Sequence, residues 1–235
     1  MKRFLILLIV LQLSVVFSYN KCIKLPDLTL PPEEITLDDM AIDDMTINKL
    51  KEINSGNIEI ISSPTTGITR EINGIFSSIK IVSKEDALRA LLNVRGIFQI
   101  SDDYSFCCIE IDKDRIDLQV FTFNQLYKGI IVDGATFRVV AMKDGTPTSV
   151  SGVYQCISDT NVVPEISSEL ALETVPLSRN AHVVALYLVV YVDKNDRSHL
   201  CWKYETCSNW LTEHNIYYVD AHDGSLIDSV STVVN

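Results

Sequence analysis

Two stretches of the sequence repeat one plan, a short amphipathic helix followed by alternating strands. In the first stretch, Ser83 precedes "KEDALRALLNVRG", where apolar residues recur at helical spacing, Asp86 takes the third helical position and Gly96 is placed to form a left-handed C-cap. Strand patterns follow at 115–123, 135–142 and 148–154. A sheet that buries one face needs a cover, and the helix is the available one.

The second stretch begins with Ser167 before the short helical pattern "SELALETV", which Pro176 ends. Strand patterns follow at 182–192, in "HLCWKYE" and in "HNIYYVDA", and Asp223-Gly224 marks a closing turn. We therefore predict an α+β fold in which a helix packed on an antiparallel sheet occurs twice. The boundary is expected between Cys156 and Pro164, where neither period is present.

The N-terminus has the pattern of a secretory signal peptide, predicted for residues 1–18. Lys2 and Arg3 precede an apolar run, and the small residue Ser18 suits cleavage before Tyr19. The apolar run is too short to cross a hydrocarbon layer of about 30 Å. We expect a soluble protein that is secreted or in the lumen of the secretory pathway, with no membrane partner after cleavage.

Residues 19–56 are rich in proline and acidic side chains, so we expect a solvated and partly mobile acidic arm. The Asp-Asp pairs of the arm lack the glycine turn and closing glutamate of an EF-hand loop. The formal net charge of the whole sequence is −11. Such a charge repels phosphate backbones and anionic lipid, so nucleic acid is not an expected partner.

Six cysteines lie beyond the predicted cleavage point, and an even number in an oxidising compartment favours disulfides. The adjacent Cys107 and Cys108 are expected on opposite faces of a strand, with different partners. The pairing stays open. The six are Cys22, Cys107, Cys108, Cys156, Cys201 and Cys207.

Patterns for catalysis or metal binding are absent from the sequence. There is no His-Glu-x-x-His, no Gly-x-Ser-x-Gly and no glycine-rich phosphate loop. A metal site of His199, Cys201 and Cys207 is the weaker alternative to disulfide and surface roles. The group of Asp220, His222 and Asp223 is better explained by an Asp-Gly turn. We predict no catalytic, metal or cofactor residues and no enzyme activity.

The run "QLYKGIIVDGA" holds a motif without reactive groups, formed by Gln125, Tyr127, Gly129, Val132 and Gly134. It resembles the Gln-x-Tyr-x-Gly-Ile-Pro-Val-x-Gly signature of the fungalysin/thermolysin propeptide (FTP) domain. The following "FRVVAMKDGTPTSVSGVY" and the preceding "TTGITREINGIF" are similar to the hairpin and leading strands of that domain. The sequence departs from the signature where isoleucine replaces the proline, which removes a fixed φ.

The C-terminal stretch resembles the PepSY domain that follows FTP in these proteases, through Val219, Asp220, Ala221 and Gly224. The two resemblances imply an FTP-like domain at 57–157 and a PepSY-like domain at 158–235, each a cystatin-like module. The glycines of both motifs are expected to serve turns and to have a mainly structural role.

The resemblance implies a propeptide that inhibits a zinc metalloprotease or helps it to fold. In the family a linker leads from PepSY to the catalytic domain, and this sequence stops at Asn235, about where that linker would begin. We therefore expect a secreted, free-standing propeptide-like protein that binds a thermolysin-like metalloprotease in trans. Two alternatives stay open: the front part of a protease precursor that lost its catalytic domain, and an interaction module with a non-protease target.

The tail "SVSTVVN", residues 229–235, is expected to leave the sheet and to lead toward the catalytic cleft of a partner. Val233 and Val234 would suit an apolar subsite, and the carboxylate of Asn235 would approach the zinc ion. A frayed terminus is the alternative.

Overall fold

The computed structural model of the chain describes residues 33–35, 46–54, 56–103, 105–112, 117–178, 180–209 and 213–232. The predicted signal peptide, most of the acidic arm, Cys22 and the three terminal residues Val233, Val234 and Asn235 lie outside these ranges. The fold is α+β, with ten strands and few helices, and this part of the prediction is confirmed.

Contacts divide the chain into two units. The larger contains Pro31–Glu165 and Val189–Cys201, and the smaller contains Ile166–Leu188 and Trp202–Asn235. Among the described residues, Val132 forms a parallel strand pair with Val190, and both residues belong to the larger unit.

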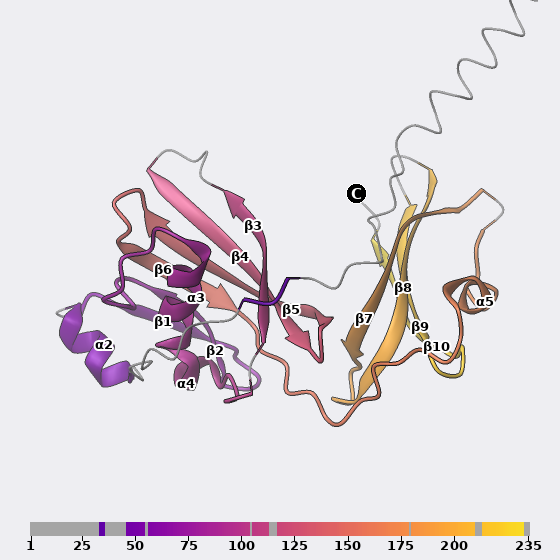
Figure 1. Ribbon diagram of the computed structural model, residues 1–235, viewed down its shortest axis with the longest axis horizontal. Coiled ribbons are helices and arrows are strands. Elements are labelled where there is room, and N and C mark those ends of the chain that lie inside the picture. The colour runs from indigo at the N-terminus through magenta and orange to yellow at the C-terminus, as the bar shows by residue number, and fades with distance from the viewer. Residues whose placement is uncertain are drawn as a thin grey trace, which may run out of the picture. The chain divides into compact units, whose positions relative to one another are not determined.

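The larger unit contains an antiparallel sheet with strand order β1-β2-β6-β5-β4-β3 (Figure 1). Its elements are α2 (Ile47–Ile53), β1 (Glu59–Ser62), β2 (Thr69–Asn73), α3 (Lys84–Leu92), α4 (Arg95–Phe98), β3 (Phe106–Asp112), β4 (Leu118–Tyr127), β5 (Ile130–Met142) and β6 (Pro147–Gly152).

The predicted helix is α3, and its predicted start is confirmed. The Ser83 hydroxyl accepts from the backbone N–H of Asp86 at 3.1 Å, and the Asp86 carboxylate accepts from the backbone N–H of Ser83 at 3.2 Å. The predicted left-handed cap at Gly96 is wrong. Gly96 lies inside α4, and Gln99 takes the left-handed conformation with φ 57°.

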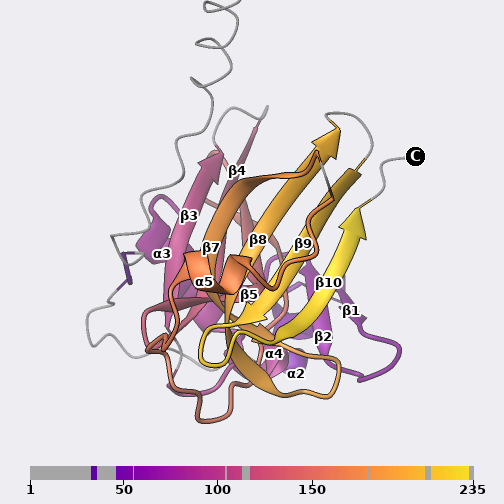
Figure 2. The same ribbon diagram turned by 90° about the vertical axis from the view of Figure 1, so that its right-hand side faces the viewer.

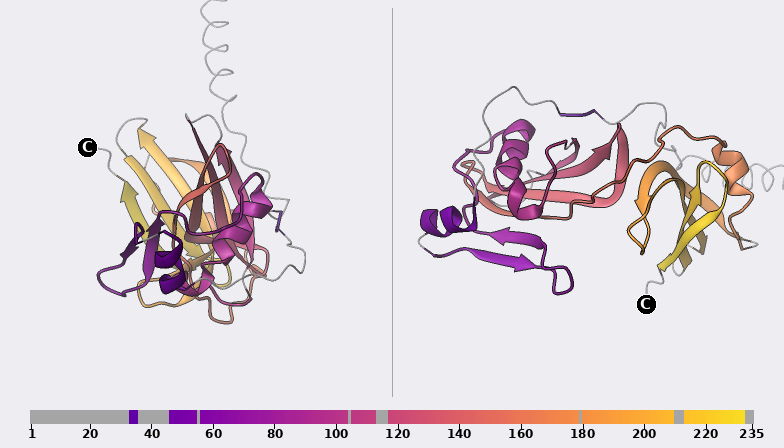
Figure 3. Two further views of the ribbon diagram at one scale, coloured as in Figure 1. Left: turned by 90° about the vertical axis from the view of Figure 1, so that its left-hand side faces the viewer. Right: turned by 90° about the horizontal axis from the view of Figure 1, so that it is seen from below.

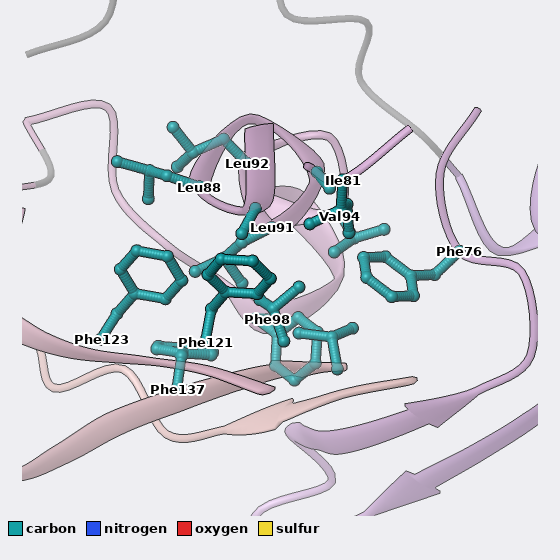
Figure 4. Packing of buried hydrophobic residues seen from close by; sticks show 14 of the residues in the cluster. Phe76, Ile81, Leu88, Leu91, Leu92, Val94, Phe98, Phe121, Phe123 and Phe137 are labelled. Carbon is teal, nitrogen blue, oxygen red and sulfur yellow. The ribbon is translucent and has the colours of Figure 1, made fainter. Parts of the chain in front are cut away.

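Helices α3 and α4 cover one face of this sheet, and their apolar side chains form the core of the larger unit together with those of the strands. Figure 4 shows Leu88 and Leu91 of α3 above the rings of Phe121 and Phe123 of β4, with Phe98 of α4 beside them. The rings of Phe98 and Phe137 meet edge to face, with centroids 5.4 Å apart. The helices therefore bury the apolar side of the strands, as the alternating pattern predicts.

The smaller unit contains α5 (Ser168–Leu172) and most of β7 (His182–Val192), β8 (Ser198–Asn209), β9 (Glu213–Asp220) and β10 (Leu226–Thr232), in the order β7-β8-β9-β10. The hydroxyl of Ser167 caps α5 as predicted, accepting from the Leu170 N–H. Helix α5 lies over one face of these strands (Figure 2), where Ala171 packs with Tyr204 and Val219.

The two units are unequal, so the structure does not clearly repeat one cystatin-like module. A nine-residue helix covers the sheet of the larger unit, whereas the longest helix described in the smaller unit has five residues. At about 1.5 Å per residue, such a helix covers only part of a sheet whose strands reach twelve residues.

Part of the predicted acidic arm is a helix, which corrects the expectation for residues 46–54. The Thr46 hydroxyl caps α2, Leu50 is fully buried in the core, and the side chain of Asn54 hydrogen-bonds both the N–H and the carbonyl oxygen of Ile75. Figure 3 shows α2 beside the β1–β2 hairpin. Burial of the apolar leucine outweighs the polar composition around it.

The expectation that the tail leaves the sheet at residue 229 is wrong. Residues 229–232 belong to β10 and pair with β9, with Ser229 opposite Tyr217 and Val230 opposite Ile216. Backbone pairing with β9 holds these residues in the sheet.

The five described cysteines form no disulfide with one another, which corrects the expectation for them. Cys107 and Cys108 do face opposite sides of β3, because Cys108 packs against the helix-covered core and Cys107 does not. The residues opposite them on β4 are Asn124 and Phe123. No cysteine stands across the ladder from either thiol, and burial raises the pKa of both.

Candidate functional site

The motif "QLYKGIIVDGA" forms the turn between β4 and β5. Tyr127 pairs with Ile130, so Lys128 and Gly129 form a two-residue loop with φ values of 49° and 81°. Two consecutive positive φ values are typical of a type I′ turn, whose twist matches that of the flanking strands. Gly129 meets this demand without strain, whereas Lys128 adopts a conformation that is costly for a residue with a Cβ.

Past the turn, β5 bulges away from β4. Leu126 pairs with Ile131 and Asn124 pairs with Thr136, so residues 132–135 of β5 lie opposite Gln125 alone. Gly134 has φ 77° inside this segment, and it supplies the left-handed residue that such an irregularity uses. The bulge places Val132 and Ala135 in a small buried cluster, together with Val190 and the partly buried Tyr127, Ile130, Ile157 and Val162.

Gln125 binds the chain segment that follows β6. Its side chain is only 2 % exposed, and its amide Nε2 donates to the carbonyl oxygen of Gln155 at 2.7 Å. The same side chain accepts from the backbone N–H of Gln155 through Oε1, at 2.9 Å. The primary amide of Gln125 thus forms hydrogen bonds with both the N–H and the carbonyl oxygen of Gln155, as the backbone of a neighbouring strand would.

Tyr127 and Lys128 bind the same segment a few residues later. The Tyr127 hydroxyl accepts from the Thr160 N–H at 3.2 Å. The Lys128 ammonium donates to the Asp159 carboxylate at 3.0 Å and to the Thr160 carbonyl oxygen at 3.3 Å. The hydrogen bond to Asp159 raises the pKa of Lys128. We refer to Gln125, Tyr127 and Lys128 with their contacts to residues 155–160 as the clamp.

The held segment also contacts the β7–β8 turn region that belongs to the larger unit. The Ser198 hydroxyl lies 2.7 Å from the Ser158 hydroxyl and 2.6 Å from the Thr160 hydroxyl. Thr160 also donates to the carbonyl oxygen of Ser158 at 3.1 Å. The clamp is therefore continuous with a second polar network, and together they fix the conformation of residues 155–160.

The PepSY-like residues build the end of β9 and the turn after it. Val219 is a fully buried core residue, and the carbonyl oxygen of Ala221 accepts from the N–H of Ile166 at 3.1 Å. The Asp220 carboxylate accepts from the N–H groups of His222 and Asp223 at 2.8 and 3.3 Å. Gly224 has φ 78° and donates to the carbonyl oxygen of Asp220. These contacts build a turn.

The other polar groups considered from the sequence form local contacts within their own units. His199 lies 3.5 Å from the Asp193 carboxylate, and the Cys207 sulfur lies 3.9 Å from Nε2 of His214. In the described part of the chain, no three His, Cys, Asp or Glu side chains gather in a way that would hold a metal ion. Within the same residues, no helix has the length and apolar character of a membrane span.

Sequence reasoning identified Gln125 and Tyr127 but did not identify what they bind. Lys128 also escaped notice, because its role depends on a carboxylate 31 residues away. No periodicity marks residues 156–160, which fall within the predicted boundary between Cys156 and Pro164. The sequence signal for these contacts is that the long polar side chains of Gln125, Tyr127 and Lys128 occur in a motif whose other residues are mostly apolar.

The comparisons with known proteins identify no family for this chain. No description of a protein family matches the sequence, and no curated protein matches it. Among solved structures, the chain is similar to the YpeB C-terminal domain of Bacillus megaterium, with 15% sequence identity and a TM-score of 0.38. The similarity covers 82% of this chain and 100% of that one. A likeness of this strength does not establish an activity.

Proposed function

We propose that this chain is a secreted, propeptide-like protein that binds a thermolysin-like zinc metalloprotease in trans and inhibits it or helps it to fold. In this proposal residues 57–157 form an FTP-like domain and residues 158–235 form a PepSY-like domain, and both are cystatin-like. The chain has no catalytic activity of its own, and the catalytic zinc site belongs to the partner.

The observation that carries the proposal is the clamp. A motif of Gln, Tyr and paired glycines without reactive groups has a shaping role in the propeptide family that it resembles. Here Gln125 and Tyr127 lie on one side of the β4–β5 hairpin and hold residues 155–160, while Gly129 and Gly134 take positive φ values. The motif residues shape the hairpin and the segment that it holds, and this shaping role supports the proposal.

The binding test uses the full chain after the predicted signal peptide. The protein is immobilised, exposed to the secretions of its source, and the bound material is identified by mass spectrometry. A metalloprotease with His-Glu-x-x-His that is retained specifically, and whose peptidase activity falls in proportion to added protein, supports the proposal. Retention of a non-protease alone, with every secreted metalloprotease left active, favours the interaction module instead.

The tail is tested by a truncation that respects β10. A chain that ends at Thr232 loses Val233, Val234 and Asn235 but keeps the paired strand. Val163→Asp is the matched control, because this valine lies in the segment between β6 and α5 and is 65% exposed. Inhibition should fall in the truncated form and stay unchanged in V163D. If the truncated form inhibits the protease as strongly as V163D and the full chain do, the tail has no part in binding.

A further inference from the structure

The sheet of the larger unit has a second face, opposite the helix-covered core. All three helices described in this unit contribute side chains to the core, where the strand residues Phe121, Val139 and Ala141 also lie. Because successive side chains of a strand point to opposite faces, the residues that alternate with these three lie on the other face. We use the name second face for Leu118, Val120 and Thr122 of β4 with Arg138, Val140 and Met142 of β5.

Four apolar side chains meet on the second face. In the β4–β5 ladder Leu118 stands opposite Met142, and Val120 stands opposite Val140. Opposed side chains of an antiparallel pair have Cβ atoms about 5 Å apart, and residues two apart on one strand are separated by about 7 Å. The four residues therefore form one apolar patch, in which Met142 is 48% exposed and the other three are partly buried. Contiguous apolar surface of this kind is typical of contact sites.

Arg138 lies beside the apolar patch as an exposed cation. It is two residues before Val140 on β5, opposite Thr122 on β4 and opposite Ser151 on β6. In the described part of the chain its guanidinium forms no ion pair. The short hydroxyl side chains on both sides leave the guanidinium accessible. A carboxylate is the group that suits it, because the two can form parallel hydrogen bonds.

The acidic character of the chain does not cancel this attraction. In the row of Arg138 across the sheet, the acidic residues are Glu71 on β2 and Glu110 on β3, each separated from β5 by one strand. Two strand spacings are about 10 Å, which exceeds the Debye length of about 8 Å at physiological ionic strength. A carboxylate in contact with Arg138 therefore gains more from this contact than it loses to Glu71 and Glu110.

The place of the patch inside the sheet determines what can occupy it. Strand β4 pairs with β3 and β5, and β5 pairs with β4 and β6, so the backbone groups beneath the patch face neighbouring strands. An occupant meets side chains alone and must satisfy its own backbone hydrogen bonds. An α-helix does so, and helices cover the opposite face of the same strands.

A helix aligned with β5 matches the spacing of the patch and the cation. The strand rises about 13 Å between Met142 and Arg138, and the patch occupies the half nearer Met142. On a helix, residues i, i+3 and i+4 form an apolar stripe, and residue i+7 lies on the same side about 10.5 Å along the axis. The flexible arginine side chain spans the remaining distance.

We propose that the second face binds an amphipathic helix of a partner protein, with apolar side chains at i, i+3 and i+4 on the apolar patch and a carboxylate at i+7 on Arg138. The patch supplies contact area, and Arg138 selects an acidic partner and fixes the direction of its helix. This surface goes beyond the proposed protease binding and does not depend on it.

The test uses a synthetic helix, acetyl-Ala-Gln-Leu-Gln-Ala-Leu-Leu-Gln-Ala-Glu-Ala-Lys-Gln-Ala-amide, in which a hydrocarbon staple replaces the first two alanines on the side away from the leucines. NMR titration of the full chain after the predicted signal peptide should show saturable shifts at the amides of residues 118–122 and 138–142. A second probe differs only in a lysine at the position of the glutamate. Its Kd for the wild type should be about tenfold higher.

A charge reversal locates the carboxylate contact. Arg138→Glu should raise the Kd of the glutamate probe about tenfold or more and should bind the lysine probe more tightly than the wild type does. A disturbed fold would weaken both probes, whereas a lost contact exchanges their order. Arg70→Glu is the matched control, because Arg70 is an exposed arginine of β2 that also forms no ion pair among the described residues. Its two Kd values should equal those of the wild type.

The apolar patch is tested by a separate substitution. Met142→Asp places a charge in the patch and should raise the Kd of the glutamate probe about tenfold. Ile61→Asp is the matched control, because Ile61 is 41% exposed on β1 at the edge of the same sheet, and its Kd should equal that of the wild type. Circular dichroism checks the fold of each variant.

Four results would overturn the proposal. The first is no binding of the glutamate probe to the wild type at millimolar peptide, and the second is shifts that map outside residues 118–122 and 138–142. The third is equal affinity of the wild type for the two probes, which needs no variant to interpret. The fourth is a change of the same shifts when the protein alone is diluted, since a second copy would then be the occupant of the second face.

Discussion

The side chain of Gln125 and the backbone of Gln155 are joined by two hydrogen bonds of 2.7 and 2.9 Å, although 30 residues separate them in the chain. One buried amide thus satisfies both backbone groups of a residue outside the sheet. The segment after β6 owes its position to this pair and to the contacts of Tyr127 and Lys128 with Asp159 and Thr160.

Gln125→Ala should lower the free energy of unfolding by about 1–3 kcal/mol, because it leaves both backbone groups of Gln155 without their partner. Gln119→Ala is the matched control on the same strand, since Gln119 makes one hydrogen bond, to the carbonyl oxygen of Met142, and should cost less. Urea denaturation measures both. Hydrogen exchange at the Gln155 amide should accelerate only in Q125A, and equal exchange in the two variants would contradict the clamp.

Gly129→Val and Gly134→Val should each cost about 1–3 kcal/mol, because valine is strained at φ values of 81° and 77°. An added Cβ meets no atom within 4 Å at either position, so the cost is conformational and Gly129→Asn should recover most of it. Gly96→Ala is the control, since Gly96 has open space and no positive φ. If G129V has the same melting temperature as the wild type, the positive φ at this position does not require glycine and the interpretation is wrong.

Gly152→Ala should be destabilising for a different reason. A Cβ at this position would overlap the fully buried ring of Phe137 and lie 2.5 Å from the carbonyl oxygen of Thr136. Neither the core ring nor the ladder can move freely, so a cost of about 1–3 kcal/mol or more is expected. In contrast to Gly129, asparagine should give no recovery here. A denaturation midpoint for G152A equal to that of the wild type would contradict the close approach.

Acid should open the turn after β7. The backbone N–H and the guanidinium of Arg197 donate to the Asp193 carboxylate and hold the pKa of Asp193 well below its ordinary value of 3.8. Because the folded pKa is lowered, this stabilisation is present above the unfolded value of about 3.9 and is lost as the pH falls further. The protection of the Arg197 amide, which is its exchange rate compared with that of an unfolded peptide at the same pH, should decrease below about pH 4.

Asp193→Asn is the comparison for the acid experiment, because asparagine does not titrate. In this variant the Arg197 amide should be less protected than in the wild type at pH 7 and should lose no further protection through this group below about pH 4. The same acid dependence in both proteins would assign the effect to another carboxylate.

The starts of two helices were predicted correctly from the sequence. Ser83 and Ser167 cap their helices as predicted, because a cap needs only a residue three positions away. Features that depend on distant partners were missed. Leu50 makes α2 part of the core in a stretch that composition assigns to a solvated arm, and pairing with β9 keeps residues 229–232 in β10. The helix predicted for "SELALETV" is shorter in the structure, where α5 ends at Leu172.

The sequence by itself determined the α+β class, the starts of two helices and the tight turn at Gly129, because periodicity, caps and positive φ values are set by residues a few positions apart. Only the tertiary structure decided what Gln125, Tyr127 and Lys128 bind, and that the described cysteines do not pair with one another. A hydrogen bond across 30 residues leaves no periodic trace, since its geometry exists only after the intervening strands have packed.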